Sequence, residues 1–278
     1  MSSPSFEPAP GAVRRIVRDG EADTVAVEEP LEIRVDGEAV AVTMRTPGHD
    51  EELALGFLYA ESLIEQARPV GLTEDFAANT VVVAGPPARR LDNRRFYTTS
   101  SCGVCGKGAI EELALHGPPV AAGWGGIALN RRLLASLPDR LVQPGFARTG
   151  GLHATGLFDS TLKLICVRED VGRHNAMDKV VGWALGQGLL PFENAVLCVS
   201  GRLSFELVQK TAVSGAAILV GVGAPTSLAV DLAQERGITL CGFARAERIN
   251  IYTWPERVEG DHGEVTESDR VETRPKEC

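Results

Sequence analysis

Two cysteines separated by two residues are the part of the sequence best suited to chemistry. Cys102 and Cys105 lie in the segment SSCGVCGKG, among small residues and directly before a stretch expected to be helical. A helix N-terminus stabilises a thiolate, and Lys107 adds a positive charge nearby. Such thiols can attack a disulfide, carry an extra sulfur as a persulfide, and be resolved by the neighbouring cysteine. The pair therefore predicts redox or sulfur-transfer chemistry.

Metal binding is the main alternative for this cysteine pair. A closed structural zinc site needs four ligands, but the sequence has no second C-x-x-C and no H-x(3–5)-H, so distant histidines would have to complete it. A zinc deaminase site needs the motif P-C-x-x-C, and Ser101 stands where the proline would be. We therefore expect no protein-ligated metal.

The other four cysteines have simpler explanations. Cys166, Cys198 and Cys241 lie inside apolar runs, where a free cysteine usually packs in the core, and Cys278 ends the sequence. The opening residues MSSPSFEPAPGA lack the basic and then apolar pattern of a secretory signal. We therefore expect a cytoplasmic protein whose thiols stay reduced, without a disulfide framework.

Polar side chains in the second half form another group of candidates. Asp170, His174 and Asp178 are spaced by four residues and are expected to share one face of a helix that follows VRE. Such a face is typical of solvated ion pairs, and also of groups that move protons or contact a ligand. His153 lies in the glycine-rich TGGLHATG and Arg202 in the loop SGRLS, where each could contact a ligand. The sequence contains no P-loop, G-x-G-x-x-G or G-x-S-x-G motif, which leaves P-loop, Rossmann and serine-hydrolase chemistry unsupported.

Four short apolar runs in the second half predict the scaffold that positions these groups. They span 161–167, 195–200, 216–222 and 238–244. Because the runs do not alternate and helix-like segments separate them, they predict strands buried on both faces of a mostly parallel sheet. Ligands bind outside the carboxyl ends of the strands in such sheets. Arginines follow three of the four runs and predict a basic rim for an anionic ligand such as a nucleotide or pterin phosphate; they are Arg168, Arg202, Arg245 and Arg248.

The first half has a mixed pattern. Residues 25–44 alternate between apolar and polar positions and predict two strands joined by a turn. Asp50 is the predicted N-cap of a helix, and residues 80–84 predict another strand. A helix is expected over 108–115, and the Pro- and Gly-rich stretch 116–126 is the best candidate for a hinge between domains.

The predicted fold class is α/β, with a mixed α+β N-terminal domain before an α/β domain that has a mostly parallel sheet. The N-terminal domain is expected over 13–126 and carries the C-x-x-C loop, and the C-terminal domain is expected over 127–255. Residues 1–12 and the acidic segment 256–278 are predicted to be disordered tails, because neither buries enough apolar surface to offset its ordering entropy.

Composition and charge exclude several classes of protein. The 278 residues carry 28 basic and 37 acidic side chains, a formal net charge of −9 that argues against a nucleic-acid partner. No apolar stretch approaches the roughly 20 residues of a membrane helix, so we expect no membrane partner. The sequence is that of an ordinary globular protein.

Six segments, taken together, resemble the FdhD family of formate dehydrogenase accessory sulfurtransferases. They are RTPGHDEELALGFL, SCGVCGKG, GGLHATGLF, REDVGRHNAMDKVVG, SGRLSFELVQK and GFARAERINIYT, in that order. The resemblance implies a protein that takes persulfide sulfur from a cysteine desulfurase of the IscS type and delivers it to the molybdenum cofactor before insertion into formate dehydrogenase. The persulfide-bearing cysteine of that family falls on Cys102.

The resemblance also implies a cofactor site, an assembly and a fold. The segment for bis-molybdopterin guanine dinucleotide falls on Phe243, Ala244, Arg245, Ala246, Glu247 and Arg248, and a guanine nucleotide would mimic that cofactor. A homodimer is implied, with a C-terminal domain similar to cytidine deaminases without their zinc ligands. The residue chemistry agrees, because arginines bind phosphates and an aromatic ring can stack on a base.

Three functions remain open from the residues. In the first, Cys102 carries the sulfur and Cys105 assists its release, with His174 and Asp170 as proton handlers or cofactor contacts. In the second, the same cysteines form a dithiol-disulfide oxidoreductase. In the third, the protein is a nucleotide-binding regulator whose thiols are structural.

Overall fold

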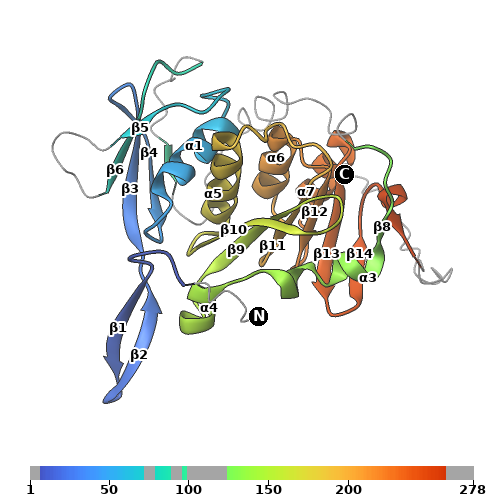
Figure 1. Cartoon of the computed structure of the whole chain (residues 1–278), viewed down its shortest axis with the longest axis horizontal. Helices are drawn as coiled ribbons and strands as arrows, with labels where there is room; N and C mark the ends of the chain where they lie inside the picture. Colours follow the sequence, from blue (N-terminus) through green and yellow to red (C-terminus); the bar gives the residue numbers. More distant parts are fainter. Residues whose placement is uncertain (1–6, 72–78, 89–95, 99–123, 261–278) are drawn as a thin grey trace, which may run out of the picture.

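A six-stranded sheet forms the centre of the molecule (Figure 1), seen in a computed structural model that describes residues 7–71, 79–88, 96–98 and 124–260. The strand order is β10-β9-β11-β12-β13-β14. The strands are β9 (His153–Phe158), β10 (Leu164–Asp170), β11 (Val196–Val199), β12 (Ile218–Gly221), β13 (Thr239–Arg245) and β14 (Arg248–Ile251). The helices between them are α5 (Arg173–Gly186), α6 (Phe205–Ser214) and α7 (Ser227–Arg236). All four predicted apolar runs form strands, and the predicted α/β class is confirmed.

The sheet is mixed rather than mostly parallel. The four predicted strands run in one direction, but of the described neighbouring pairs within this sheet only β11–β12 and β12–β13 are parallel. The antiparallel β9 lies between β10 and β11, and the antiparallel β14 adds an edge. The sequence prediction missed β9 because GGLHATG is typical of a loop. Gly156 lets Leu141 pack closely against this strand, since a Cβ there would lie 2.4 Å from Cδ2 of Leu141 and that side chain would have to shift.

A second sheet of five strands forms the N-terminal part, in the order β5-β6-β3-β4-β7. Its strands are β3 (Glu29–Val35), β4 (Glu38–Arg45), β5 (Val70–Gly71), β6 (Thr80–Val83) and β7 (Phe96–Thr98), and α1 (Asp50–Ala60) packs against it. The predicted pair of strands within 25–44 is confirmed as β3 and β4. The predicted N-cap is wrong by one residue, because His49 is the cap and Asp50 begins the helix.

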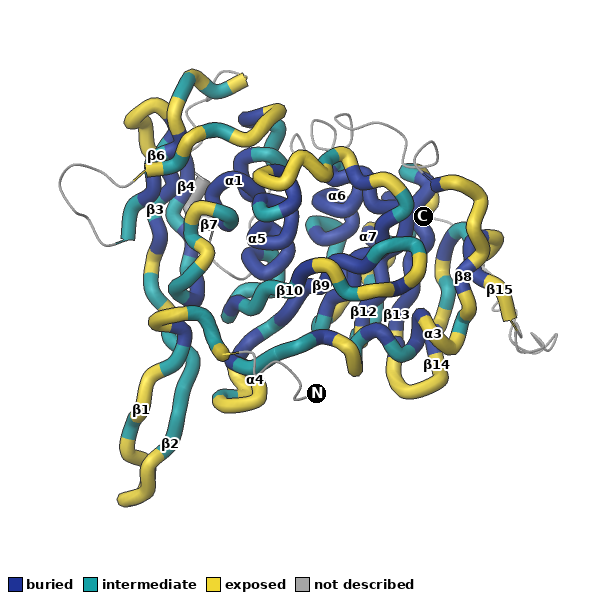
Figure 2. The backbone as a smooth tube through the Cα atoms, viewed as in Figure 1, coloured by how far each residue is buried: buried dark blue, intermediate teal, exposed yellow. Residues whose placement is uncertain are grey.

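The ends of the described chain are more ordered than the predicted tails. Ala12 is buried, and a hairpin of β1 (Val13–Arg18) and β2 (Glu21–Ala26) projects from the body with mostly exposed or half-exposed residues (Figure 2). Near the other end, β15 (Val258–Glu259) pairs with β8 (Leu129–Asn130), and Val258 is buried. The short helices α3 (Arg131–Ala135), η2 (Leu137–Arg140), α4 (Pro144–Thr149) and η3 (Pro255–Arg257) complete the described elements.

The two halves of the chain meet where α1 crosses α5. A Cβ on Gly56 would lie 1.8 Å from the carbonyl oxygen of Asp178, and a Cβ on Gly182 would lie 1.8 Å from that of Glu52. Only glycine allows the helix backbones to approach so closely. The crossing therefore fixes the N-terminal sheet against the central sheet.

The glycine crossing predicts opposite effects of two alanine substitutions in α5. Gly182→Ala should lower the free energy of unfolding by about 1–3 kcal/mol or more, because the added methyl overlaps backbone that cannot move independently. Gly186→Ala is the matched control, since a Cβ there meets nothing within 4 Å. It should be neutral or stabilising by up to about 1 kcal/mol, and urea unfolding of both variants would measure the difference.

Candidate functional site

One edge of the central sheet gathers most of the predicted site residues. The strands β10, β11, β12 and β13 end there and β9 begins there, so His153 lies opposite Asp170 and Val199 opposite Thr155. We call this the carboxyl edge, formed by His153, Asp170 and the residues that follow β11, β12 and β13. It is the edge at which sheets with this strand direction bind ligands.

His153 lies against the loop that follows β11. Its Nδ1 is 3.5 Å from Oγ of Ser200, and that Oγ accepts a hydrogen bond of 2.9 Å from the backbone N–H of Ala154. A Cβ on Gly201 would lie 3.5 Å from Nδ1 of His153 and 3.7 Å from Cδ of Arg173, so the two basic side chains flank this glycine. Burial holds the pKa of His153 below its ordinary value, and the charges of Arg173 and His174 lower it further.

His174 connects the first turns of two helices. It lies in the first turn of α5, and its Nε2 is 2.8 Å from Oε2 of Glu206 and 3.1 Å from Oγ of Ser204 at the start of α6. The hydrogen bond with His174 lowers the pKa of Glu206, although burial opposes that effect. Sequence reasoning missed Glu206, whose only local signal is an acidic residue in the first turn of a helix.

The His174–Glu206 contact predicts a measurable pKa change. Replacing His174 with leucine should raise the pKa of Glu206, because burial then acts without the opposing hydrogen bond. In the wild type the depressed carboxyl pKa stabilises the fold above the unfolded-state pKa, and this contribution is lost as the pH falls through the folded-state pKa. A ¹³C NMR titration of the Glu206 carboxyl would measure the shift. A pKa that stays at or below the wild-type value would contradict the assignment.

Asp170 and Asp178 are structural partners of lysines, which corrects the predicted helix face. Strand β10 continues to Asp170 and α5 begins only at Arg173, so Asp170 is not on the helix. Asp170 is fully buried, and its Oδ2 lies 2.7 Å from Nζ of Lys179. It also accepts hydrogen bonds from the backbone N–H groups of Thr46 and Gly172. Asp178 is buried in the same way, 2.7 Å from Nζ of Lys210.

The predicted cofactor segment forms the hairpin between β13 and β14. Phe243 is 49% exposed and has a φ of 52°, and its N–H donates to the carbonyl of Gly223. Ala244 is buried, whereas the remaining four residues are exposed: Arg245, Ala246, Glu247 and Arg248. Arg202 is exposed on the loop after β11, next to Gly223. The carboxyl edge thus brings His153, His174 and Arg202 together, with the hairpin at its far end.

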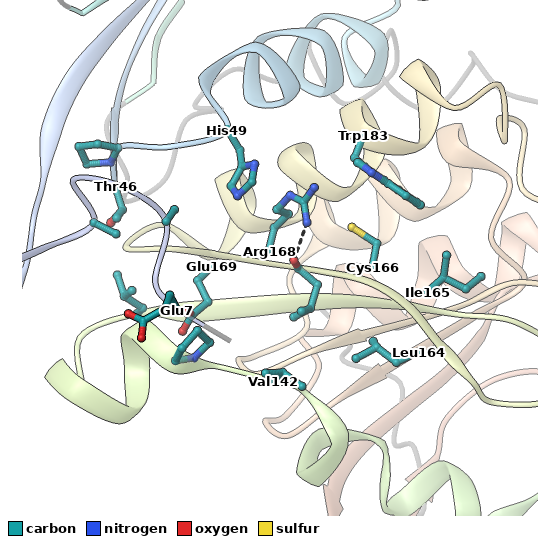
Figure 3. Close-up of a pocket in the computed structure, with 16 residues that line it drawn as sticks. Glu7, Thr46, His49, Val142, Leu164, Ile165, Cys166, Arg168, Glu169 and Trp183 are labelled. Carbon is teal, nitrogen blue, oxygen red and sulfur yellow. Dashed lines mark hydrogen bonds between the residues drawn. The ribbon is translucent and has the colours of Figure 1, made fainter. Parts of the chain in front are cut away.

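A cavity of about 340 Å³ lies elsewhere, beside the free edge of β10 (Figure 3). Trp183, His49 and the side chain of Arg168 line it, but Arg168 already makes two hydrogen bonds with Glu52. Burial raises the pKa of the lining thiol of Cys166 to about 11. Arg168, which the sequence assigned to the basic rim at the ends of the strands, lines this cavity instead.

Cys102, Cys105 and Cys278 lie outside the described residues, but the strand that leads to the first pair is described. Strand β7 ends at Thr98 and runs parallel to β4, with Thr98 opposite Thr43. Oγ1 of Thr43 donates a hydrogen bond of 3.2 Å to Oδ1 of Asn175, the neighbour of His174. The described chain therefore approaches the carboxyl edge four residues before Cys102.

In the described part of the chain, no group of three or more His, Cys, Asp and Glu side chains is arranged to hold a metal ion. No helix within it is long and apolar enough to cross a membrane.

Comparison with known proteins places the chain in a family. The model of the FdhD/NarQ family matches residues 26–259. The chain belongs to the FdhD/NarQ family. Two FdhD/NarQ relatives named sulfur carrier protein FdhD come from Mycolicibacterium paratuberculosis and Streptomyces coelicolor. The first is 49% identical to this chain, and the match covers 85% of this chain and 92% of the relative. The second is 46% identical, and the match covers 87% of this chain and 93% of the relative.

A solved structure shares the FdhD/NarQ fold of this chain. It is the crystal structure of a candidate formate dehydrogenase accessory protein from Desulfotalea psychrophila, with a TM-score of 0.67 and 26% sequence identity. The match covers 89% of this chain and 97% of that one. The resemblance drawn from the six sequence segments is thereby confirmed at the level of family and fold.

Proposed function

We propose that this protein is a sulfurtransferase that accepts persulfide sulfur from a cysteine desulfurase of the IscS type on Cys102. It then delivers the sulfur to bis-molybdopterin guanine dinucleotide before this molybdenum cofactor enters formate dehydrogenase. The name sulfur carrier protein borne by relatives at 46–49% identity supports the carrier role. The name formate dehydrogenase accessory protein, borne by the similar structure, supports the client. We further propose that it acts as a cytoplasmic homodimer.

The position of Thr98 is the observation that supports this proposal most strongly. Four residues of extended chain span at most about 14 Å, and Thr98 pairs with Thr43, whose side chain contacts the start of α5. A sulfur on Cys102 therefore has the carboxyl edge within its covalent reach. Sulfur transfer requires this proximity, because the donor sulfur and the accepting cofactor must meet.

The described cysteines are unsuited to the carrier role. Burial raises the pKa of Cys166 to about 11 and that of Cys241 to about 12, and it also raises the pKa of the fully buried Cys198. These thiols stay protonated near neutral pH and are therefore poor nucleophiles. Their protonation supports the proposal that the sulfur chemistry belongs to the C-x-x-C pair, which lies outside the described residues.

The release of sulfur from Cys102 needs no reactant other than the persulfide and the thiol of Cys105. The thiol of Cys105 attacks the inner sulfur of the Cys102 persulfide, and a Cys102–Cys105 disulfide forms. The bond to the terminal sulfur breaks, and this sulfur leaves as hydrosulfide with the electron pair of that bond and the proton of Cys105. Hydrosulfide is the species delivered to the molybdenum. A cellular dithiol must reduce the disulfide before the next cycle.

The hairpin at the end of β13 supports the cofactor part of the proposal. Arg245 and Arg248 are exposed and suit phosphate oxygens, and the half-exposed ring of Phe243 can stack on a guanine. We propose that the cofactor is cargo that the protein binds and releases.

Formate dehydrogenase activity in cells tests the proposal. In cells lacking their own carrier, Cys102→Ala should give activity at the background of an empty vector, whereas Cys166→Ala should retain it. A nucleotide-binding regulator with structural thiols predicts instead that Cys102→Ser keeps full activity. A dithiol oxidoreductase predicts that Cys102 accepts no sulfur from a desulfurase, although the pair cycles with thioredoxin. Either of those results would replace the carrier role.

A further inference from the structure

Arg173 is a cation without a partner among the described residues. It begins α5 at the carboxyl edge, and its Nε is buried and makes no hydrogen bond to any described residue. No described carboxylate forms an ion pair with it. A buried donor that lacks an acceptor costs folding free energy, and a charged donor costs more than a neutral one. An anionic ligand at this point would supply the acceptor.

The surroundings of Arg173 favour such an anion. The side chain lies against Gly201, with His153 on the other side of that glycine, and the exposed Arg202 follows directly. The hydroxyl of the fully buried Thr155, two residues along β9 from His153, also lacks a partner among the described residues. The nearby acid Glu206 bonds to His174, and the charge of Arg173 also lowers its pKa, so Glu206 offsets part of the positive charge of the group without contacting Nε of Arg173.

The helix termini at the same edge add a favourable field. Neither α5 nor α6 has a side-chain cap, although Thr226 caps α7 through its hydroxyl. Both uncapped helices are at least ten residues long and touch each other. Their first N–H groups carry partial positive charge that is not neutralised by a capping side chain.

We propose that Arg173, His153 and Arg202, with the N-termini of α5 and α6, bind the diphosphate group of the guanine nucleotide. The identity of the nucleotide and its diphosphate rest on the proposed function, whereas the binding of an anion at this point is argued from these contacts. Phe243 is three strand neighbours from β9, or roughly 14 Å along the edge. This separation allows the base to stack at the β13–β14 hairpin while the phosphates extend toward Arg173. The guanidinium of Arg173 then binds phosphate oxygens in a fork.

Calorimetric titration of the full chain with inorganic pyrophosphate, GDP and guanosine tests the diphosphate site. Arg173→Ala should weaken pyrophosphate and GDP binding by about tenfold or more, as expected for the loss of a charge-assisted hydrogen bond. The affinity of Arg173→Lys for pyrophosphate and GDP should lie between those of Arg173→Ala and the wild type, since lysine keeps the charge but cannot bind two oxygens as the guanidinium does. Guanosine has no phosphate and should bind the Arg173→Ala variant and the wild type with the same affinity. Arg14→Ala, an exposed arginine on β1, is the matched control.

A second measurement separates ligand binding from a merely structural role. Pyrophosphate should raise the pKa of His153 in a ¹H–¹⁵N NMR titration, because the anion offsets the charges of Arg173 and His174. Asp170 and Glu206, the described acids that face this group, are already paired with Lys179 and His174. Three results would each contradict the proposed diphosphate site. They are no binding of pyrophosphate to the wild type, an affinity of Arg173→Ala for pyrophosphate within twofold of the wild-type value, and a His153 pKa that pyrophosphate does not change.

The two proposals fail independently. Persulfide loading of Cys102 by a desulfurase in the wild type tests the carrier role and needs no nucleotide. Absence of loading together with intact pyrophosphate binding at Arg173 would refute the carrier role alone. Loading without pyrophosphate binding would refute the diphosphate site alone.

Discussion

Replacing Lys179 with methionine is expected to lower the free energy of unfolding by about 3–5 kcal/mol. Lys179 and Asp170 are both essentially inaccessible to solvent, and their charged atoms lie 2.7 Å apart. Nζ of Lys179 also donates 2.8 Å to the carbonyl of Thr46. Removing the lysine leaves a carboxylate without a counter-charge in the interior, which is the costliest way to disturb such a pair.

Two further variants identify the cause of that loss. Lys163→Met removes an exposed lysine and should change the unfolding free energy by no more than about 0.5 kcal/mol. The double variant Lys179→Met with Asp170→Leu should recover part of the stability, because no charge is then left buried. Urea unfolding measures all three. A loss below about 1 kcal/mol in Lys179→Met would show that the pair does not hold the two halves together.

The position of this pair explains why stability and site are linked. Asp170 accepts from the backbone of Thr46, and Asn175 donates to the carbonyl of Met44 and accepts from Thr43. These contacts attach the end of β4 to the start of α5. Since β7 runs beside β4, the same contacts set where the chain leaves β7 toward Cys102.

The strands that could be predicted most directly from the sequence are those whose residues are buried along their whole length. The runs that became β11 and β12 are buried at every position, so unbroken apolar sequence indicated them directly. Strand β9 is buried at every position after His153, but it contains Gly156, against which Leu141 packs closely, and glycine locally resembles a turn. The β1–β2 hairpin was missed because VRRIVR has exposed arginines at positions with no buried partner face.

The site was predictable residue by residue and not as a set of contacts. The sequence indicated His174 and Arg202 because they follow predicted strands, and it indicated His153 because that residue lies in a glycine-rich segment. It could not indicate that Glu206 bonds to His174, since the two are 32 positions apart and meet only through packing of α5 on α6. The sequence prediction placed Asp170 on a helix because it is four residues before His174. The structure shows instead that β10 extends as far as Asp170.

Replacing Cys102 with alanine is expected to abolish sulfur loading altogether. A persulfide needs a thiolate to accept the sulfur, and the described cysteines are held protonated by burial. Cys105→Ala should still load sulfur on Cys102 and release it more slowly, because the attacking thiol is missing. Cys166→Ala is the control and should load and release at the wild-type rate. Labelled cysteine supplied through a desulfurase gives both rates.

The mass of the peptide that contains Cys102, measured after incubation with a desulfurase and cysteine, tests the sulfur-carrier role most directly. We predict one additional sulfur atom on that peptide, localised to Cys102, removed by a thiol reductant and absent from Cys102→Ala. Finding no added sulfur, or finding it on another cysteine while Cys102→Ala loads normally, would contradict the carrier role of Cys102.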